Sequence, residues 1–238
     1  MAHTFRSLAE PNYRHWFAGA LISNTGTWMQ RTAQDWIVLT YLTNNSASAL
    51  GITMALQMGP QLIMFPFAGA IADRFSKRRL LMVTQTLLGA VGLLLFVLVI
   101  TDAIELWHVY LTALALGILA TLDNPARQAF VSELVGEKLL PNAVSLNSAS
   151  FNGARMIGPA VAGVLTALIG AGPVFLISGL GFAATLTVLI RLDQTRLHPS
   201  SRRGTGGILG GFKYLRQRPD VTIVLVVLLF VFKFWLNF

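Results

Sequence analysis

The sequence predicts an all-α integral membrane protein, and two observations carry this fold class. Only 12% of the 238 residues are charged and 54% are hydrophobic, whereas a soluble domain carries about a quarter charged residues. The hydrophobic residues also gather into stretches of roughly 20, the length that an α-helix needs to cross a bilayer. Backbone groups in lipid must be hydrogen-bonded within the protein, so we expect each stretch to be a helix.

Seven stretches meet or approach this length: 16–42, 50–72, 80–100, 106–122, 143–169, 174–190 and 221–238. The segment between the sixth and the seventh is basic and rich in glycine, which is typical of a cytoplasmic tether near anionic lipid. We therefore expect three regions. Residues 1–192 should form a six-helix bundle, residues 193–219 a basic cytoplasmic linker, and residues 220–238 the start of a seventh transmembrane helix.

The positive residues favour one orientation. Of the 18 Lys and Arg residues, three (Arg31, Arg155 and Lys233) lie inside predicted spans, and the other fifteen fall on one side if the N-terminus is cytoplasmic. The three loops on the opposite side hold none. This asymmetry follows the positive-inside rule. It predicts a multi-pass protein of the cell (inner or plasma) membrane with a cytoplasmic N-terminus, and it explains the net charge of +8 without a nucleic-acid partner.

Polar side chains follow one face of the first span. Arg31 and Asp35 are four residues apart, and Asn24, Thr27 and Gln34 extend the same stripe. A charged side chain at the centre of a membrane helix costs on the order of 2.5–3.5 kcal/mol on insertion scales, so this face should meet other helices or a hydrated cavity. A second stripe follows the fifth span at Ser145, Ser148, Asn152 and Arg155. Together the two stripes indicate a hydrated path.

Two interpretations of Asp35 remain open at this point. In the first, Asp35 binds a proton or a cationic substrate group, and Arg31 or Arg155 is its switchable partner. In the second, Arg31 and Asp35 form a fixed ion pair that holds helices together, since residues at this spacing can pair on a helix.

Small residues in the fifth span predict close helix packing. Ala154 and Gly158 are four apart, Gly153 and Gly163 flank them, and Pro159 removes a backbone hydrogen bond and bends the helix. Close packing is the simpler interpretation of these residues, and a bending element is the second.

The segment 69–79, Gly-Ala-Ile-Ala-Asp-Arg-Phe-Ser-Lys-Arg-Arg, resembles the signature of the major facilitator superfamily in the loop between the second and third helices. Ser76 replaces a glycine of that pattern. The resemblance implies the six-helix N-terminal half of a major facilitator fold plus the start of a seventh helix. It also implies a cytoplasmic gate made by the residues Gly69, Asp73, Arg74, Lys77, Arg78 and Arg79.

Two further runs, at 123–127 and at 146–159, are similar to a bacterial branch that includes enterobactin exporters and drug-efflux permeases. The resemblance implies a secondary active, proton-coupled exporter of siderophore-like or drug-like molecules, driven by the proton gradient and without a cofactor. Because the family has two six-helix halves, the resemblance implies that this chain is truncated after its first six helices. Such a fragment needs its missing C-terminal half or a second copy. A channel and a transport-inactive fragment are the alternatives.

An enzyme is not expected. The four histidines are scattered, the chain has no cysteine, and no metal-binding motif is present in the sequence.

Overall fold

The computed structural model describes residues 3–198 and leaves undescribed the side chains of His3, Thr4, Phe65, Pro66 and Asp73. Over this range the chain is helical and contains no strand, which confirms the all-α class. The predicted linker is described only as far as residue 198, and the predicted seventh helix lies outside the described residues. The elements are η1 (His3–Ala9), α1 (Pro11–Ile37), η2 (Val38–Leu42), α2 (Ala47–Arg74), α3 (Lys77–Ile100), α4 (Leu106–Ile169), α5 (Ala171–Arg191) and η3 (Gln194–Arg196).

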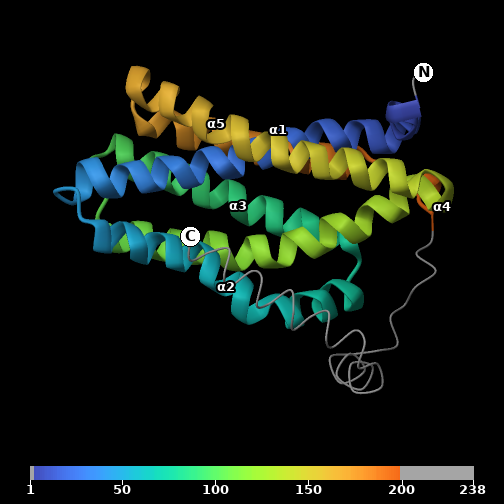
Figure 1. Cartoon of the computed structure of the whole chain (residues 1–238), viewed down its shortest axis with the longest axis horizontal. Helices are drawn as coiled ribbons and strands as arrows, with labels where there is room; N and C mark the ends of the chain where they lie inside the picture. The colour runs from blue at the N-terminus through green and yellow to red at the C-terminus, as the bar shows by residue number, and fades with distance from the viewer. Residues whose placement is uncertain (1–2, 199–238) are drawn as a thin grey trace, which may run out of the picture. The chain divides into compact units, whose positions relative to one another are not determined.

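The 64-residue α4 is two helices joined by a sharp reversal at Gly136, which has φ +67° and ψ 177°. A positive φ favours glycine because other residues place a Cβ against the backbone there. We refer to residues 106–135 as the first arm of α4 and to residues 137–169 as the second arm. The two arms supply the fourth and fifth predicted spans, so in the described residues the bundle consists of α1, α2, α3, the two arms of α4, and α5. Figure 1 shows their arrangement.

The connection between these two spans corrects the sequence analysis. We expected residues 123–142 to form a cytoplasmic segment outside the helices, but the first arm continues through it as far as the reversal at Gly136. Pro125 and Pro141 lie within the helical arms. As a result Arg127 is buried inside the bundle, with only 6% of its surface exposed, and is not a loop residue.

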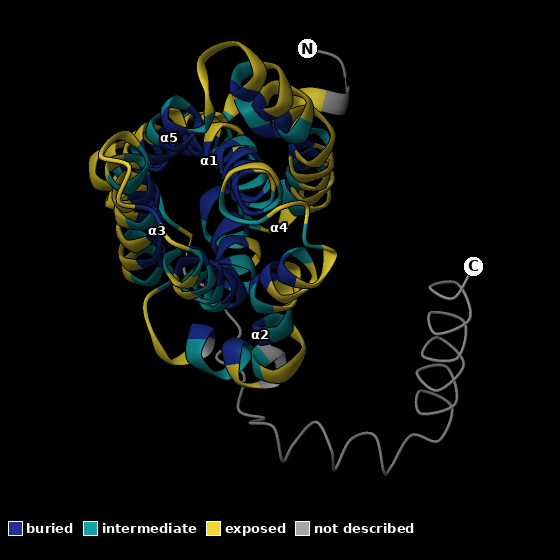
Figure 2. Ribbon diagram, turned by 90° about the vertical axis from the view of Figure 1, so that its left-hand side faces the viewer, coloured by how far each residue is buried: buried dark blue, intermediate teal, exposed yellow. Residues whose placement is uncertain are grey.

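Helix α1 packs against α4 and α5, while α2 packs mainly on α4 and α3 on α5. A view along the helices shows that buried residues line their inward faces and exposed residues their outward faces (Figure 2). The exposed surface carries large apolar side chains on α2, α3, α4 and α5, as a lipid-facing surface should. By length and composition, α3, α4 and α5 could each cross a membrane.

Two apolar clusters occupy the two ends of the bundle. One is built around Tyr13, Trp16 and Phe130, and the other around Met29 and Phe175. Buried polar side chains lie between these clusters, and they form the site described below.

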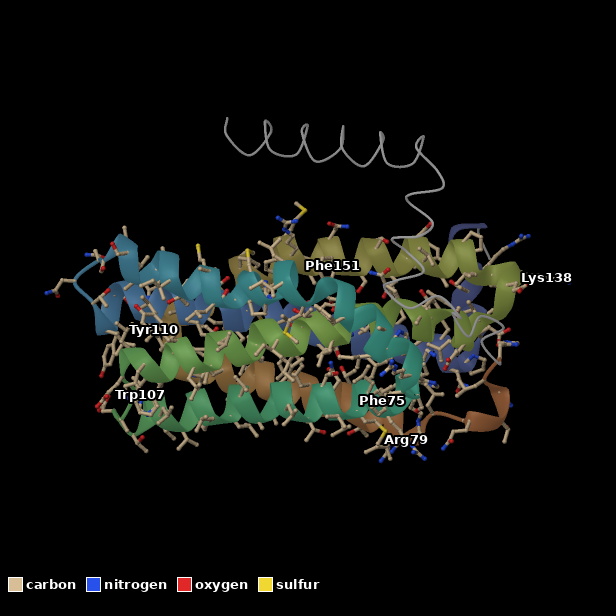
Figure 3. All side chains as sticks on the ribbon, turned by 90° about the horizontal axis from the view of Figure 1, so that it is seen from below. Phe75, Arg79, Trp107, Tyr110, Lys138 and Phe151 are labelled. Atoms are coloured by element: carbon tan, nitrogen blue, oxygen red, sulfur yellow. The ribbon has the colours of Figure 1, made fainter. Side chains whose placement is uncertain are left out.

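The ends of the bundle differ in their surface residues. Arg79 and Lys138 lie at one end, and Trp107 and Tyr110 lie at the other (Figure 3). Tryptophan and tyrosine are enriched where a membrane helix meets the lipid headgroups.

Candidate functional site

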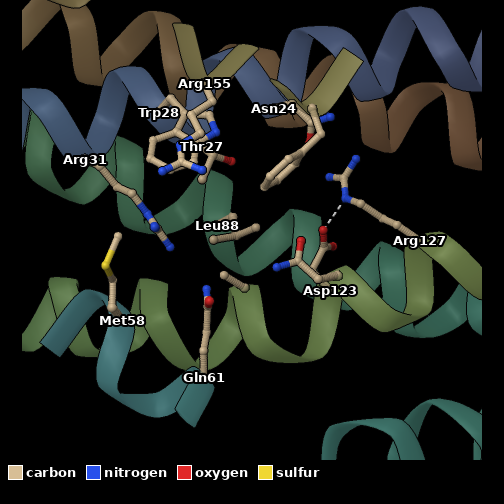
Figure 4. A pocket seen from close by; sticks show the side chains of 13 residues that line it. Asn24, Thr27, Trp28, Arg31, Met58, Gln61, Leu88, Asp123, Arg127 and Arg155 are labelled. Carbon is tan, nitrogen blue, oxygen red and sulfur yellow. Dashed lines mark hydrogen bonds and ion pairs between the residues drawn. The ribbon is translucent and has the colours of Figure 1, made fainter. Parts of the chain in front are cut away.

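Two adjoining cavities lie within the bundle. The central cavity has a volume of about 260 Å³ and the side cavity a volume of about 480 Å³. Asn24, Asn124, Arg127 and Phe151 line both of them. The remaining residues of the central cavity come from α1, α2, α3 and both arms of α4: Thr27, Trp28, Arg31, Met58, Gln61, Leu88, Ala120, Asp123 and Arg155 (Figure 4).

One wall of the central cavity is built on Trp28. The guanidinium carbon of Arg31 lies 5.3 Å from the centre of the indole ring, and that of Arg155 lies 5.5 Å from it. Phe151 meets the same ring at 6.2 Å with an angle of 68° between the ring planes. Trp28 and Arg31 are three residues apart on α1, whereas Arg155 reaches the ring from the second arm of α4. One indole thus brings together two positive groups from two helices.

The opposite wall holds a buried ion pair between Asp123 and Arg127 on the first arm of α4. Thr84 and Gln85 of α3 donate hydrogen bonds to the Asp123 Oδ1 atom at 2.5 and 2.9 Å. The Arg127 Nη2 atom donates a hydrogen bond of 3.0 Å to Ser23 of α1, and its guanidinium lies 5.4 Å from the Trp16 ring. This network links three helices and satisfies most of the polar atoms of the pair, as a buried pair requires.

In the described part of the chain no ion pair joins Arg31 and Asp35, and the two side chains interact only over a longer distance. Asp35 instead accepts a hydrogen bond of 3.3 Å from Gln57 of α2. The same Gln57 amide donates to Gln34, and Gln34 donates to Thr112 of α4. Gln34 and Asp35 line neither cavity. The competing side-chain amides explain the difference, since Gln57 offers Asp35 a donor from a neighbouring helix.

Only part of the polar stripe predicted on the fifth span lines a cavity. Ser145 and Asn152 hydrogen-bond to the carbonyl oxygens four residues before them. Ser148 and Asn152 line the side cavity, and Arg155 lines the central cavity. Arg155 is an exposed residue and not a fully sheltered one.

The loop between α2 and α3 is well formed without the expected glycine. Ser76 has φ −63° and its hydroxyl accepts a hydrogen bond from the Arg79 amide at the start of α3. A serine suits this position because it caps the helix and needs no positive φ. Arg78 donates hydrogen bonds to the carbonyl oxygens of Leu189 and Ile190 at the end of α5. The side chain of Asp73 lies outside the described residues, and a Cβ on Gly69 would meet nothing within 4 Å.

The predicted packing residues of the fifth span divide into two groups. A Cβ on Gly158 would lie 2.6 Å from the Trp28 Cβ atom and 3.1 Å from the Thr25 carbonyl oxygen, and Ala154 is fully buried. These two residues do bring the second arm of α4 close to α1. Gly153 and Gly163, in contrast, have no neighbour within 4 Å of such a Cβ. Pro159 lies inside the second arm, which stays helical around it.

Trp28, Gln57, Asp123 and Arg127 are not among the site residues predicted from the sequence. The Asp123–Arg127 pair carried a usable signal, since its spacing of four residues is that of a helical ion pair. Placing both residues in a connecting segment concealed it. No local pattern marks Gln57, because the residues to which it donates hydrogen bonds lie on α1. The same holds for Trp28, because two of its three partners lie on the second arm of α4.

Comparison with known proteins places this sequence in a family. Residues 2–235 match the family described as transmembrane secretion effector. The chain is 32% identical over 193 residues to the staphyloferrin A transporter of Staphylococcus aureus. These residues make up 80% of the chain and 48% of that relative. It is 26% identical to the enterobactin exporter of Shigella boydii, over 74% of the chain and 43% of the relative.

A third relative is the macrolide efflux protein A of Streptococcus pyogenes, with 24% identity over 64% of the chain and 38% of the relative. The chain therefore spans less than half the length of each of these three relatives. The apolar helical bundle, the polar cavity inside it and the match along nearly the whole sequence agree. The chain belongs to the transmembrane secretion effector family of the major facilitator superfamily of transporters.

Proposed function

We propose that the chain forms the N-terminal half of a secondary active transporter that exports a small molecule in exchange for protons. The central cavity carries this proposal. Charged and amide side chains from α1, α2 and α4 line it, and such groups inside a membrane protein usually mark the path of a solute or ion. The names of the relatives, which mention two siderophores and a macrolide, support a siderophore-like or drug-like substrate.

Asp35 is our candidate for the exchanged proton. Its carboxylate accepts a hydrogen bond from an amide of α2, and no arginine of the described residues lies within ion-pair distance of it, so protonation would break none of the ion pairs described here. Arg31, four residues earlier on α1, lines the central cavity. A charge change at Asp35 would therefore act on a residue of the cavity wall. The alternative is that Asp35 only helps to hold α1 against α2.

The loop from Gly69 to Arg79 is our candidate for the cytoplasmic gate. Arg78 ties the start of α3 to the end of α5, which fixes this end of the loop. Arg74 and Arg79 are exposed and free to meet a partner. The family signature in this loop supports the gate. We also propose that the N-terminus is cytoplasmic and that the chain lies in the plasma membrane.

The partner of this half is the other half of the proposed transporter. Substrate sites in transporters built from two halves lie at the interface between them. A C-terminal half or a second copy of the chain would complete the site, and the chain's coverage of less than half of its relatives supports this proposal.

Uptake into proteoliposomes tests the proposal. The chain alone, and the longest product of its reading frame, would be assayed with fluorescent dyes and ferric siderophores, with and without a pH gradient. Saturable flux that depends on the gradient is expected from the transporter. Ohmic current would support a channel, and the absence of flux from both proteins would support an inactive fragment.

The variant Asp35→Asn tests the proton site in the same assay. We expect flux driven by the pH gradient to fall at least tenfold, while downhill flux without a gradient persists. Arg191→Gln is the control, because Arg191 is an exposed residue at the end of α5 and away from both cavities. Gradient-driven flux equal to that of the unmodified chain would remove Asp35 from the mechanism.

A further inference from the structure

The central cavity is positively charged. Its charged lining residues are three arginines, Arg31, Arg127 and Arg155, and one aspartate, Asp123. Asp123 is committed to Arg127, so the lining has a formal charge of +2, located on Arg31 and Arg155. Both of these face the same indole ring. Two like charges held around one ring repel each other, and a negative ligand would relieve this repulsion.

The arginines also have unused hydrogen-bond donors. In the described residues neither Arg31 nor Arg155 takes part in an ion pair. Arg31 is only 6% exposed, and its buried Nε atom has no hydrogen-bond partner. The buried Nη1 atom of Arg127 has none either. Buried donors are normally satisfied, and guanidinium groups match the geometry of carboxylates especially well.

Asp35 does not supply the missing acceptor. Asp35 is the nearest carboxylate along α1 and interacts electrostatically with Arg31, but it accepts its hydrogen bond from Gln57 and does not line the cavity. Figure 4 shows Arg31 and Arg155 entering the cavity beside Trp28, with Arg127 directed towards Asp123 on the other side. The lining of this cavity therefore offers donors and positive charge beside Trp28, and its one carboxylate in the described residues, Asp123, is paired with Arg127.

We propose that the central cavity binds an organic anion, with its carboxylates held by Arg31 and Arg155 and any flat ring of the ligand placed against Trp28 or Phe151. This proposal rests on the proposed function and names its substrate class. Asn24 and Asn124, which border both cavities, supply further hydrogen bonds to a ligand that extends into the side cavity. A cationic ligand would lie beside two positive groups and is disfavoured.

Equilibrium binding tests the substrate class independently of transport. The full chain would be placed in phosphatidylcholine nanodiscs, which contain no net anionic lipid, and titrated with radiolabelled citrate, salicylate and tetraphenylphosphonium. We expect both anions to bind and the cation not to bind. Arg155→Gln should weaken citrate binding about tenfold, which corresponds to about 1.4 kcal/mol. Arg155→Lys should recover part of this loss, because it retains the charge without the planar fork.

Arg191→Gln removes the same charge away from the cavities and should leave citrate binding unchanged. Arg155 is the main test site because it is exposed, so its substitution should not unfold the chain. Equal citrate affinity in the Arg155→Gln and Arg191→Gln variants, or binding of tetraphenylphosphonium in preference to both anions, would overturn the proposal.

The two proposals can fail separately. Anion binding that requires Arg155, without uptake into proteoliposomes, would leave the anion site in place and reject transport. Gradient-driven uptake of a cationic dye by a chain that binds neither citrate nor salicylate would support the proposed transport function and reject the proposed anion site.

Discussion

Three arginines reach the central cavity, and they are stabilised in two ways. Arg127 has a carboxylate four residues before it on the same helix, and side chains from α1 and α3 complete its network. Arg31 and Arg155 lie against the face of Trp28, an interaction worth about 0.5–2 kcal/mol, and Arg31 also interacts electrostatically with Asp35 without forming an ion pair in the described residues. The first arrangement suits a permanent structural contact. The second leaves the guanidinium groups available to a ligand.

This difference predicts that Asp123 matters for stability. In Asp123→Asn the buried Arg127 loses its counter-charge, which should lower the free energy of unfolding by about 3–5 kcal/mol. The double variant Asp123→Asn, Arg127→Gln should recover much of this loss because no uncompensated charge remains. Thermal unfolding in detergent micelles measures both effects.

The exposed pair Asp193–Arg196, with an N–O distance of 3.3 Å, provides the control for this comparison. Asp193→Asn should leave the unfolding temperature unchanged, because solvent screens an exposed pair. A double variant of Asp123 and Arg127 as unstable as the sum of its two single variants would show that the pair is not the source of the effect.

At the scale of elements, glycines set the closest contacts between helices. The first arm of α4 approaches α2 at Gly117, where a Cβ would lie 2.6 Å from the Leu56 carbonyl oxygen and 2.8 Å from that of Gln57. The second arm approaches α1 at Gly158. Because the opposing atoms at Gly117 belong to the backbone, a larger residue could be accommodated only if a whole helix moved.

We therefore expect Gly117→Ala to destabilise the bundle by about 1–3 kcal/mol, the usual cost of overpacking. Gly153→Ala is the matched control on the second arm, where a Cβ meets nothing within 4 Å. That substitution should be neutral or stabilising by up to about 1 kcal/mol, because alanine is the better helix former. Chemical unfolding of both variants measures this difference in the free energy of unfolding. An equal loss of stability in the two variants would contradict the prediction.

The existence of the six helices could be predicted from the sequence, because length and hydrophobicity determine where a chain can cross lipid, but the helical continuation through residues 123–142 could not. Of the residues expected on a hydrated path, Asn24, Arg31 and Arg155 line the central cavity, whereas Gln34 and Asp35 line neither cavity. The contact at Gly117 could not be predicted, because nothing local to it identifies α2 as its neighbour. The hydrogen-bond partner of Asp35 could not be predicted either, because Gln57 belongs to another helix.

At the scale of the whole molecule, the bundle has two unlike ends. Arg79 and Lys138 lie at one and Trp107 and Tyr110 at the other (Figure 3). Between the two apolar clusters near these ends, the polar side chains of α1, α3 and α4 form a central layer.

The proposed orientation can be tested directly because the chain has no cysteine. Single cysteines introduced at Arg79 and Lys138 should react with a membrane-impermeant maleimide only after the cytoplasmic side of cells is exposed. A cysteine at Asn44, an exposed residue in the turn before α2, should react in intact cells. Labelling of all three from the same side would contradict the topology.

The way the arginines are paired also has a consequence for biosynthesis. Asp123–Arg127 and Trp28–Arg31 are each contained in one helix, so both contacts can form as that helix leaves the translocon. Arg155 finds its ring on α1, a segment synthesised much earlier. The second arm of α4 consequently gains this contact only where α1 has already been inserted, and assembly of this wall follows the order of synthesis.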